Sequence, residues 1–283
     1  MQAHASRGTA LITGASSGIG ALYADRLAHA GFDLILVARR ADRLRVLAED
    51  LTTRTGRSIE ILAADLTESA GLAAIENVLR TDASITMLVN NAGIGGTAPL
   101  LHSDIHEMER MIALNVNAPT RLAYAAAPAF VARGRGTIVN IASIVAVAPE
   151  VLNGVYGASK SYVLAFSQSL QHELADKGVR VQVVLPGATA TDFWSVAGTP
   201  VEHLPQAMVM SAEDLVDAAL AGLAQGEFAT IPALPDIAQW EAYEQARKAM
   251  APNLSLTRPA ARYGIAGRDA AGDVDRRAHA AEA

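Results

Sequence analysis

The chain has 283 residues, of which 51% are apolar, with a formal net charge of −6 and no cysteine. This length and apolar content allow one large α/β core. The acidic balance, without a cluster of lysines and arginines, disfavours nucleic acid and anionic membranes as partners, so we expect a small-molecule substrate. The missing cysteines exclude disulfides, zinc-thiolate sites and cysteine nucleophiles.

Residues 1–7 lack the apolar core of a signal peptide, and no run approaches the ~18 apolar residues of a membrane-spanning helix. We therefore expect a soluble, cytoplasmic protein with no membrane partner. His102 and His106 have a spacing that fits metal ligation, but neither a third histidine nor an H-E-x-x-H glutamate accompanies them. We predict no metal site here and a solvated helix face instead.

Short apolar, β-branched runs alternate with stretches of helical period and predict seven strands. The runs are Thr9–Thr13, Asp33–Ala38, Ile59–Ala63, Thr86–Asn90, Gly136–Ile141, Val179–Leu185 and Phe228–Ile231. Near-continuous hydrophobicity in the second and sixth runs indicates strands that are covered on both faces by crossover helices. The predicted fold class is α/β: a doubly wound parallel sheet (Rossmann) with helices on both faces and ligands at the carboxyl ends of its strands.

We assign residues 1–251 to a single Rossmann-fold catalytic domain and residues 252–283 to a C-terminal tail. The tail has prolines, alternating charges and few large apolar groups, so we expect it to be flexible or to dock on a neighbouring subunit. Residues 188–210 form a long connection that carries Phe193 and Trp194. A loop this long and this apolar predicts a lid.

A glycine-rich turn with Gly14, Gly18 and Gly20 follows the first predicted strand and opens a predicted helix. Missing side chains at these positions let backbone amides approach a pyrophosphate at the positive end of the helix. The alternative is a tight connection without a ligand. The lysine of a P-loop is absent, which disfavours hydrolysis of nucleoside triphosphates.

The second strand ends at Ala38 and is followed by Arg39 and Arg40, where a dinucleotide fold usually places an acid on the ribose 2′-hydroxyl. Cations at a helix N-terminus oppose the macrodipole, so this placement needs another benefit. Arg39 stacking on adenine and contacting a 2′-phosphate would supply it. The pair therefore predicts NADP(H) rather than NAD(H), with a solvated basic pair as the alternative.

Tyr156 and Lys160 leave the same face of a predicted helix one turn apart. A phenol with a pKa near ~10 must lose roughly 3 units of pKa to exchange protons near neutral pH. A lysine ammonium at about 4 Å, together with the positive charge of an oxidised nicotinamide, would supply the required free energy. The alternative is a surface pair without a catalytic role.

Ser143 follows the fifth predicted strand at its carboxyl edge, where its hydroxyl can donate to a substrate carbonyl oxygen. By itself it would be an ordinary turn residue, and the partnership with Tyr156 is what suggests a role in catalysis.

Asn115 belongs to a long predicted helix and is placed on a buried stripe, where a polar group needs a reason. The apolar members of this stripe are Ile105, Met108, Met111 and Ile112. Pro119 has no N–H, so the Asn115 carbonyl is left free to hold a water that relays protons from Lys160. The alternative is an asparagine that only forms hydrogen bonds at a proline kink.

Together these residues resemble the short-chain dehydrogenase/reductase family, in its single-domain branch with TGxxxGxG and YxxxK motifs, over roughly residues 7–232. The matches are Thr13 to Gly20, Asn90 to Gly93, the catalytic set Asn115, Ser143, Tyr156 and Lys160, and Pro186, Gly187 and Thr191. The resemblance implies that Tyr156 exchanges the proton and that Lys160 holds the nicotinamide ribose and lowers the tyrosine pKa. It also implies that Ser143 orients the substrate oxygen and that Asn115 positions a relay water.

The same resemblance implies the cofactor contacts. They are Gly14, Ser16, Ser17, Gly18, Ile19, Gly20, Arg39, Arg40, Asp65, Leu66, Asn91, Ala92, Gly93, Tyr156, Lys160, Pro186, Gly187, Thr189 and Thr191. Asp65 matches the acid that contacts adenine but could instead be a local cap of the helix after Thr67, and residues 90–93 could be only a strand-end turn. Thr189 stands where similar proteins usually have Ile or Val, and its backbone is expected to face the carboxamide.

We predict an NADP(H)-dependent oxidoreductase that transfers a hydride between nicotinamide and a ketone or secondary alcohol of a mostly apolar small molecule, with Tyr156 as general acid/base. The expected substrate pocket consists of Ile94, Ile144, Val145, Phe193 and Trp194, supported by Val147, Val151 and Leu152. The two aromatics are either pocket walls or core anchors of the lid. Alternatives for the function are a 3-ketoacyl thioester reductase and a non-catalytic dinucleotide-binding regulatory protein. By resemblance we expect a homodimer or homotetramer, assembled through helices near residues 104–133 and 156–177.

Overall fold

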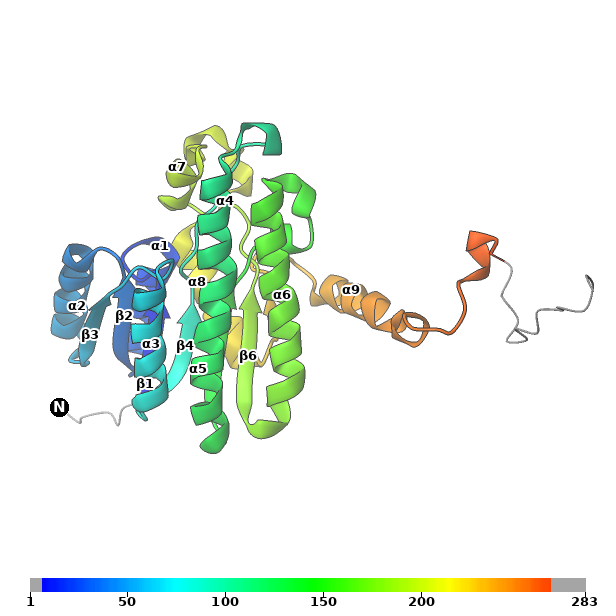
Figure 1. Cartoon of the computed structure of the whole chain (residues 1–283). Coiled ribbons are helices and arrows are strands. Elements are labelled where there is room, and N and C mark those ends of the chain that lie inside the picture. The colour runs from blue at the N-terminus through cyan, green and yellow to red at the C-terminus, as the bar shows by residue number, and fades with distance from the viewer. Residues whose placement is uncertain (1–6, 266–283) are drawn as a thin grey trace, which may run out of the picture. The chain divides into compact units, whose positions relative to one another are not determined.

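The computed structural model describes residues 7–265, which divide into two units, residues 7–233 and 234–265. The first unit contains the sheet (Figure 1). The second contains the helix α9 (Ile237–Ala249), which the sequence prediction had included in the catalytic domain. The division thus precedes the predicted boundary at residue 251, and the predicted tail lies partly outside the described residues.

Seven parallel strands form one sheet in the order β3-β2-β1-β4-β5-β6-β7. They are β1 (Thr9–Thr13), β2 (Asp33–Ala38), β3 (Ile59–Ala63), β4 (Ile85–Asn90), β5 (Gly136–Ile141), β6 (Val179–Val184) and β7 (Ala229–Thr230). The predicted strands are confirmed, with small shifts at the ends of β4, β6 and β7. The strand order reverses at β1, which pairs with β2 on one side and β4 on the other, and such a switch point opens a ligand crevice.

Alternate residues of the strands enter two separate apolar clusters, so both faces of the sheet are covered. Ile12 of β1 belongs to the same cluster as Leu44 and Val216, whereas its neighbour Leu11 belongs to the cluster that contains Leu122 and Leu170. The helices on the first face are α1 (Gly18–His29), α2 (Ala41–Thr55) and α8 (Ala212–Gln225). Those on the second face, which lie in front of the sheet in Figure 1, are α3 (Ser69–Thr81), α5 (Ala118–Ala132) and α6 (Gly154–Leu174).

Helix α6 carries the predicted catalytic pair, and its boundaries follow from local chemistry. The Asn153 carboxamide oxygen caps the start by accepting from the N–H groups of Val155 and Tyr156. A 3-10 turn prolongs the helix to Lys177, and Gly178 ends it with φ +75°. A Cβ at residue 178 would lie 2.2 Å from the Gly134 carbonyl oxygen, so this end of the helix requires glycine.

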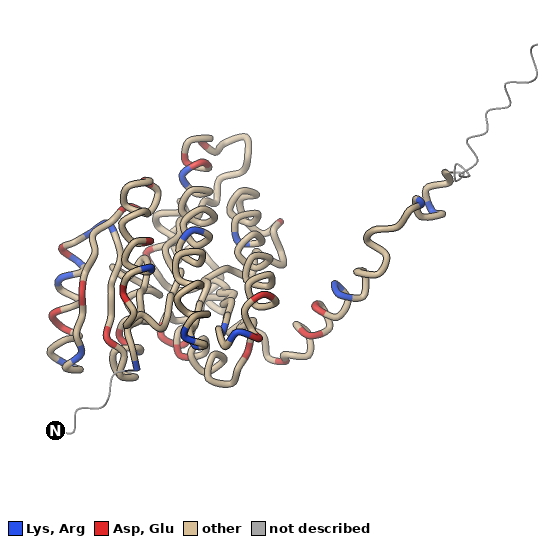
Figure 2. The backbone as a smooth tube through the Cα atoms, turned by 60° about the horizontal axis from the view of Figure 1, so that its bottom comes forward, with Lys and Arg blue, Asp and Glu red and all other residues tan. Residues whose placement is uncertain are grey.

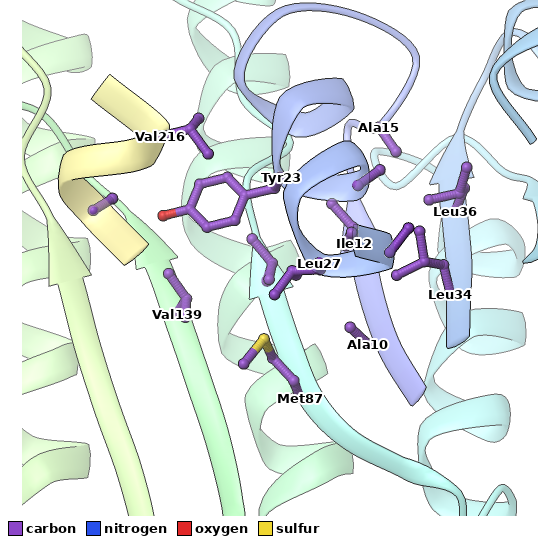
Figure 3. Close-up of a cluster of buried hydrophobic side chains, with 14 of the residues drawn as sticks. Ala10, Ile12, Ala15, Tyr23, Leu27, Leu34, Leu36, Met87, Val139 and Val216 are labelled. Carbon is purple, nitrogen blue, oxygen red and sulfur yellow. The ribbon is translucent and has the colours of Figure 1, made fainter. Parts of the chain in front are cut away.

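The core on the first face contains a buried phenol hydroxyl, that of Tyr23. Figure 3 shows the Tyr23 ring reaching from α1 towards Val216 of α8 and Val139 of β5. Its hydroxyl has no hydrogen-bond partner among residues 7–265, and burial raises the pKa of this phenol. A buried hydroxyl without a partner lowers the stability of the fold.

Acidic and basic residues alternate along the backbone in Figure 2. One group of them ties the helices of the first face together. Arg54 of α2 lies 2.6 Å from Asp25 of α1, and Arg26 of α1 lies 2.7 Å from Asp217 of α8. In residues 7–265 no helix has the length and apolar character that crossing a membrane demands.

The helix predicted around Asn115 consists of α4 (Ile105–Ile112), a π-helical turn (Ala113–Asn117) and α5. Met108, Met111 and Asn115 are buried as predicted. The prediction is wrong for Ile105 and Ile112, which are 64% and 43% exposed. The face that packs inward carries the 108, 111, 115 spacing, whereas Ile105 lies in the first turn of α4, just after the exposed 3-10 turn Leu100–His102.

Candidate active site

Residues that follow the strands β1 to β6 at their carboxyl ends surround one cavity of about 530 Å³. The predicted cofactor residues line it, except Gly20, and so do Ser143 and all five predicted substrate-pocket residues. Asn115 lies behind the lining. The structure therefore brings the separate sequence motifs to one place, while the individual cofactor contacts remain a prediction.

The glycine turn after β1 has the shape of a phosphate cradle. Gly14 and Gly18 have φ of +67° and +54°, and a Cβ at Gly20 would lie 2.4 Å from the Gly14 carbonyl oxygen. The Ser17 side chain does not cap α1, and no acidic residue stands in its first turn. The start of α1 thus lines the cavity with N–H groups that no side chain caps and no acid in its first turn, which fits a bound pyrophosphate.

The segment after β4 holds the glycine turn in place. Asn91 Nδ2 donates to the carbonyls of Thr13 at 2.9 Å and Gly14 at 3.3 Å. The Thr13 hydroxyl accepts from the N–H groups of Asn91 and Ala92, each at 3.0 Å. Asn90 is buried in β4 and donates to Asn140 Oδ1 at 2.9 Å. These bonds agree with the stabilising-turn alternative for residues 90–93, although Asn91, Ala92 and Gly93 also line the cavity.

Three arginines and one acid surround the far end of the cavity. Arg39 lies 3.9 Å from Asp65, and both line the cavity together with Arg40 and Arg110. Asp65 Oδ1 accepts from the N–H and the hydroxyl of Thr67, a local turn that precedes α3, whose N-cap is Glu68. Burial alone would raise the pKa of Asp65, but these bonds and the charges of Arg39 and Arg110 outweigh it and lower that pKa. Asp65 is therefore an anion whose charge is neutralised by neighbouring cations.

The predicted catalytic side chains meet between β5 and α6. Tyr156 lies beside Ser143, whose Oγ donates to the Pro186 carbonyl at 3.3 Å. Lys160 Nζ lies 5.8 Å from the centre of the Tyr156 ring and donates to the Ile141 carbonyl at 2.9 Å. All three of these catalytic candidates are buried, so the alternative of a surface pair is wrong.

The pKa values of this pair differ from the prediction. Burial raises the pKa of Tyr156 to about 12, and the neighbouring Ser143 hydroxyl offsets only part of this effect. Burial also lowers the pKa of Lys160 to about 8. The predicted lowering of the tyrosine pKa by Lys160 is therefore not seen in this structure, because removal from water disfavours charge on both groups.

The Asn115 side chain connects two segments of the site by hydrogen bonds. It forms hydrogen bonds with both backbone groups of Ile94 and with the Ser159 hydroxyl. Ser159 stands between Tyr156 and Lys160 on α6, and Ile94 lines the cavity. The carboxamide of Asn115 thus joins the loop after β4 to the catalytic helix, a role that the sequence did not reveal.

The predicted lid, residues 188–210, contains helical turns and is not an irregular loop throughout. It includes α7 (Phe193–Ala197) and two 3-10 turns, and a parallel bridge joins Thr189 to Met210 at its base. Trp194 is buried and its Nε1 donates to the Thr189 carbonyl at 3.0 Å, so it anchors the lid. Phe193 packs with its ring centre 5.7 Å from that of Tyr156 and forms a wall of the cavity.

The apolar part of the lining agrees with the prediction apart from one residue. Ile94, Val145, Leu152 and Phe193 pack around Tyr156. Val147 is 39% exposed and lies outside the lining, because the 3-10 turn after Ser143 ends there and carries its side chain away.

Comparison with known proteins agrees with this geometry. A sequence model described as short chain dehydrogenase matches residues 8–200. The chain belongs to the short-chain dehydrogenase family. Serine 3-dehydrogenase of Agrobacterium fabrum is 37% identical over 188 residues, which cover 66% of this chain and 74% of that protein.

Solved structures of this family superpose over nearly the whole chain. A short-chain dehydrogenase from Sphingobium yanoikuyae in complex with NADPH is 48% identical, with a TM-score of 0.88 over 90% of this chain and 100% of its own. The bulky-bulky ketone specific alcohol dehydrogenase from Comamonas testosteroni is 44% identical, with a TM-score of 0.84 over 92% and 99% of the two chains.

Several residues of this short-chain dehydrogenase site were missed by sequence reasoning. They are Gly95, Arg110, Val196, Leu204, Pro205 and Met208 in the lining, and Thr97 beneath the lid. Arg110 could have been predicted from the sequence, because it precedes Asn115 by little more than one turn on the same predicted helix. The others face the cavity only because distant segments meet there.

Proposed function

We propose that the chain is an NADP(H)-dependent oxidoreductase that transfers a hydride between nicotinamide and a ketone or secondary alcohol of a mostly apolar small molecule. The observation that carries this proposal is that buried Tyr156, Ser143 and Lys160 line the same cavity as the glycine cradle. The relatives that bind NADPH and act on bulky ketones support it.

The chain's own residues account for cofactor binding. The N–H groups around Gly14 and Gly18 would hold the pyrophosphate, and Lys160 the nicotinamide ribose. Arg39 and Arg40 would pair with a 2′-phosphate, because both line the cavity and the Arg39 side chain is 60% exposed, at 3.9 Å from Asp65. When bound, the nicotinamide supplies or accepts the hydride.

Tyr156 would donate its proton to the substrate oxygen during reduction and recover it from solvent. Ser143 would donate to the same oxygen and so fix the carbonyl between the two hydroxyls. Ionised Tyr156 is costly in this buried site, so a nearby positive charge is needed to stabilise it. Lys160 provides one such charge, and a water on the Asn115 carbonyl would return the proton.

We also propose a homo-oligomer formed through α5 and α6. Tyr124 on α5 stacks on Phe166 of α6 with ring centres 6.5 Å apart, and Tyr162 stacks on the same ring at 5.8 Å. Tyr124 is 70% exposed, so these helices present an aromatic surface to solvent. Sedimentation velocity of wild type and Tyr124→Lys tests the assembly: a monomeric wild type contradicts it.

The function is tested with a panel of ketones, alcohols and an acyl thioester, assayed with NADPH and NADH by absorbance of the reduced nicotinamide. We expect turnover of apolar ketones with NADPH. Tyr156→Phe is expected to lower kcat by about 10³-fold while NADPH affinity is kept within about threefold. Near-wild-type turnover by Tyr156→Phe contradicts the mechanism, and a preference for the thioester favours the ketoacyl reductase.

A further inference from the structure

Gly95 and Phe193 occupy a single space under the lid. Gly95 lies in the segment after β4, and Phe193 opens α7. A Cβ at residue 95 would lie 2.2 Å from Cζ and 2.8 Å from Cε2 of the Phe193 ring. The tip of the ring therefore fills the position that any side chain at residue 95 would need.

The ring is also restrained on its other sides. It stands at 90° to the Trp194 indole with the ring centres 5.6 Å apart, and that indole is fixed by its bond to Thr189. On the cavity side its centre is 5.7 Å from that of Tyr156. Gly95, Trp194 and Tyr156 together hold the Phe193 ring in one position.

This position of the Phe193 ring limits the size of the substrate. The proposed chemistry places the carbonyl oxygen against Tyr156 and Ser143, so both groups attached to the carbonyl carbon lie within a few bonds of the Tyr156 ring. One of them must then meet the Phe193 ring. The Phe193 ring can occupy this position because Gly95 has no side chain. The cavity widens on that side only if the ring moves.

We infer that Gly95 and Phe193 together set the size of the carbonyl substituent that is admitted beside Tyr156. This inference rests on the proposed function and adds to it the residues that determine substrate size. Phe193 acts by direct contact with the substrate, whereas Gly95 is a positioning residue that acts only through the ring.

Symmetrical ketones provide the probe, because the substituent that faces Phe193 grows whichever way the molecule binds. The measured quantity is the ratio of kcat/KM for nonan-5-one to that for pentan-3-one with NADPH. Phe193→Ala is expected to raise this ratio about tenfold, since a methylene that no longer clashes is worth about that factor. Phe193→Leu, a smaller change that preserves packing, should raise it by an intermediate amount.

A double-mutant cycle separates Gly95 from a general effect of the loop. Gly95→Ala should change the ratio about threefold or more in the wild-type background and less than about 1.5-fold in the Phe193→Ala background, where no ring is left to displace. Gly96→Ala is the matched control. A Cβ there would meet only the mobile ends of Met111 at 3.3 Å and Met108 at 3.7 Å, so the ratio should stay unchanged.

An unchanged ratio in both Phe193 variants overturns the inference, and so does an equal effect of Gly95→Ala in both backgrounds. A readout without turnover keeps the test separate from the proposed function. The dissociation constants of the two ketones from the complex with NADP⁺, measured by calorimetry, should shift by the same ratios. If these shifts appear while the wild type reduces neither ketone, the proposed function fails and the size limit stands; if they do not appear, the inference fails.

Discussion

Asn115 and Ile94 are joined by two hydrogen bonds: Asn115 Nδ2 donates to the Ile94 carbonyl at 2.8 Å, and Asn115 Oδ1 accepts from the Ile94 N–H at 3.0 Å. A third bond, to the Ser159 hydroxyl at 3.0 Å, connects the same carboxamide to α6. Asn115→Leu removes all three bonds and leaves the part-buried N–H and carbonyl of Ile94 without this partner, so it is expected to lower the free energy of unfolding by about 2–4 kcal/mol in urea denaturation. Asn117→Leu, at an exposed position of the same π turn, should change it by less than about 0.5 kcal/mol. Equal losses of unfolding free energy in the two variants would show that the hydrogen bonds of Asn115 do not stabilise the fold.

Lys160 makes the stability of the chain depend on pH in a defined window. Burial lowers its pKa to about 8 in the folded chain, against 10.5 for the free side chain. Between these values the unfolded chain binds more protons, so stability rises with pH; below the window the folded chain bears the full cost of the buried ammonium.

Comparison with Lys160→Met isolates this effect. The unfolding free energy of the wild type minus that of the variant should rise by about 3 kcal/mol from pH 8 to pH 10.5. The raised pKa of Tyr156 weakens the folded state only above pH 10, and both chains share it. Urea denaturation across this range is the measurement, and a pH-independent difference would show that the ammonium is not buried.

Removing the Tyr23 hydroxyl is expected to stabilise the fold. The group is fully buried without a hydrogen-bond partner in residues 7–265, so Tyr23→Phe removes a polar atom that has lost its water. The free energy of unfolding should increase by about 1 kcal/mol. Tyr162→Phe is the control, because that hydroxyl pairs with Thr120 at 2.8 Å and its loss should not stabilise. A lower stability of Tyr23→Phe would reveal a bound water or another partner.

Thr97 secures the lid from below. Its Oγ1 donates to the Ala197 carbonyl at 2.9 Å and accepts from the Thr199 hydroxyl at 3.1 Å. Thr97→Val keeps the shape and removes both bonds, so the lid should open more often and KM for the ketone should rise about three- to tenfold. Thr199→Val removes one bond and should have a smaller effect. Unchanged KM in both variants would mean that the lid does not close the substrate site.

Arg39 is expected to decide cofactor preference. Arg39→Ala should lower kcat/KM for NADPH about 100-fold, since it removes charge-assisted bonds to the 2′-phosphate, and should leave kcat/KM for NADH within about threefold. Arg45→Ala, at an exposed position on α2, is the control for net charge. An equal loss with both cofactors would assign Arg39 to adenine stacking or structure, and an NADH preference in the wild type would remove the basis of the argument.

Local patterns in the sequence predicted the sheet and most of the site. The strands β1 and β5 are short apolar runs bounded by turn residues, and the spacing of Tyr156 and Lys160 places both on one helix face. The motifs meet because parallel strands present their carboxyl ends at one edge.

Features that depend on distant contacts were not predictable in this way. Thr97 and Ala197, which meet under the lid, are 100 residues apart in the chain, and nothing in either local pattern indicates the other. The pKa of Tyr156 followed burial rather than the neighbouring cation, and burial is a property of the whole fold. The π turn at Asn115 likewise arises from packing, since a proline alone does not distinguish it from a kink.

The bridge between Thr189 and Met210 gives the lid a fixed frame. Met210 N–H donates to the Ala188 carbonyl and Ala190 N–H to the Met210 carbonyl, each at 2.9 Å, so the two ends of the lid are held together independently of what lies between them. Because closing a longer loop costs only slightly more entropy, we expect that residues 200–207, which lie beyond the contacts of Phe193, Trp194 and Thr97, can be lengthened or exchanged while α6 stays in place. Substrate range could then change through this outer part of the lid while the residues that contact Tyr156 are kept.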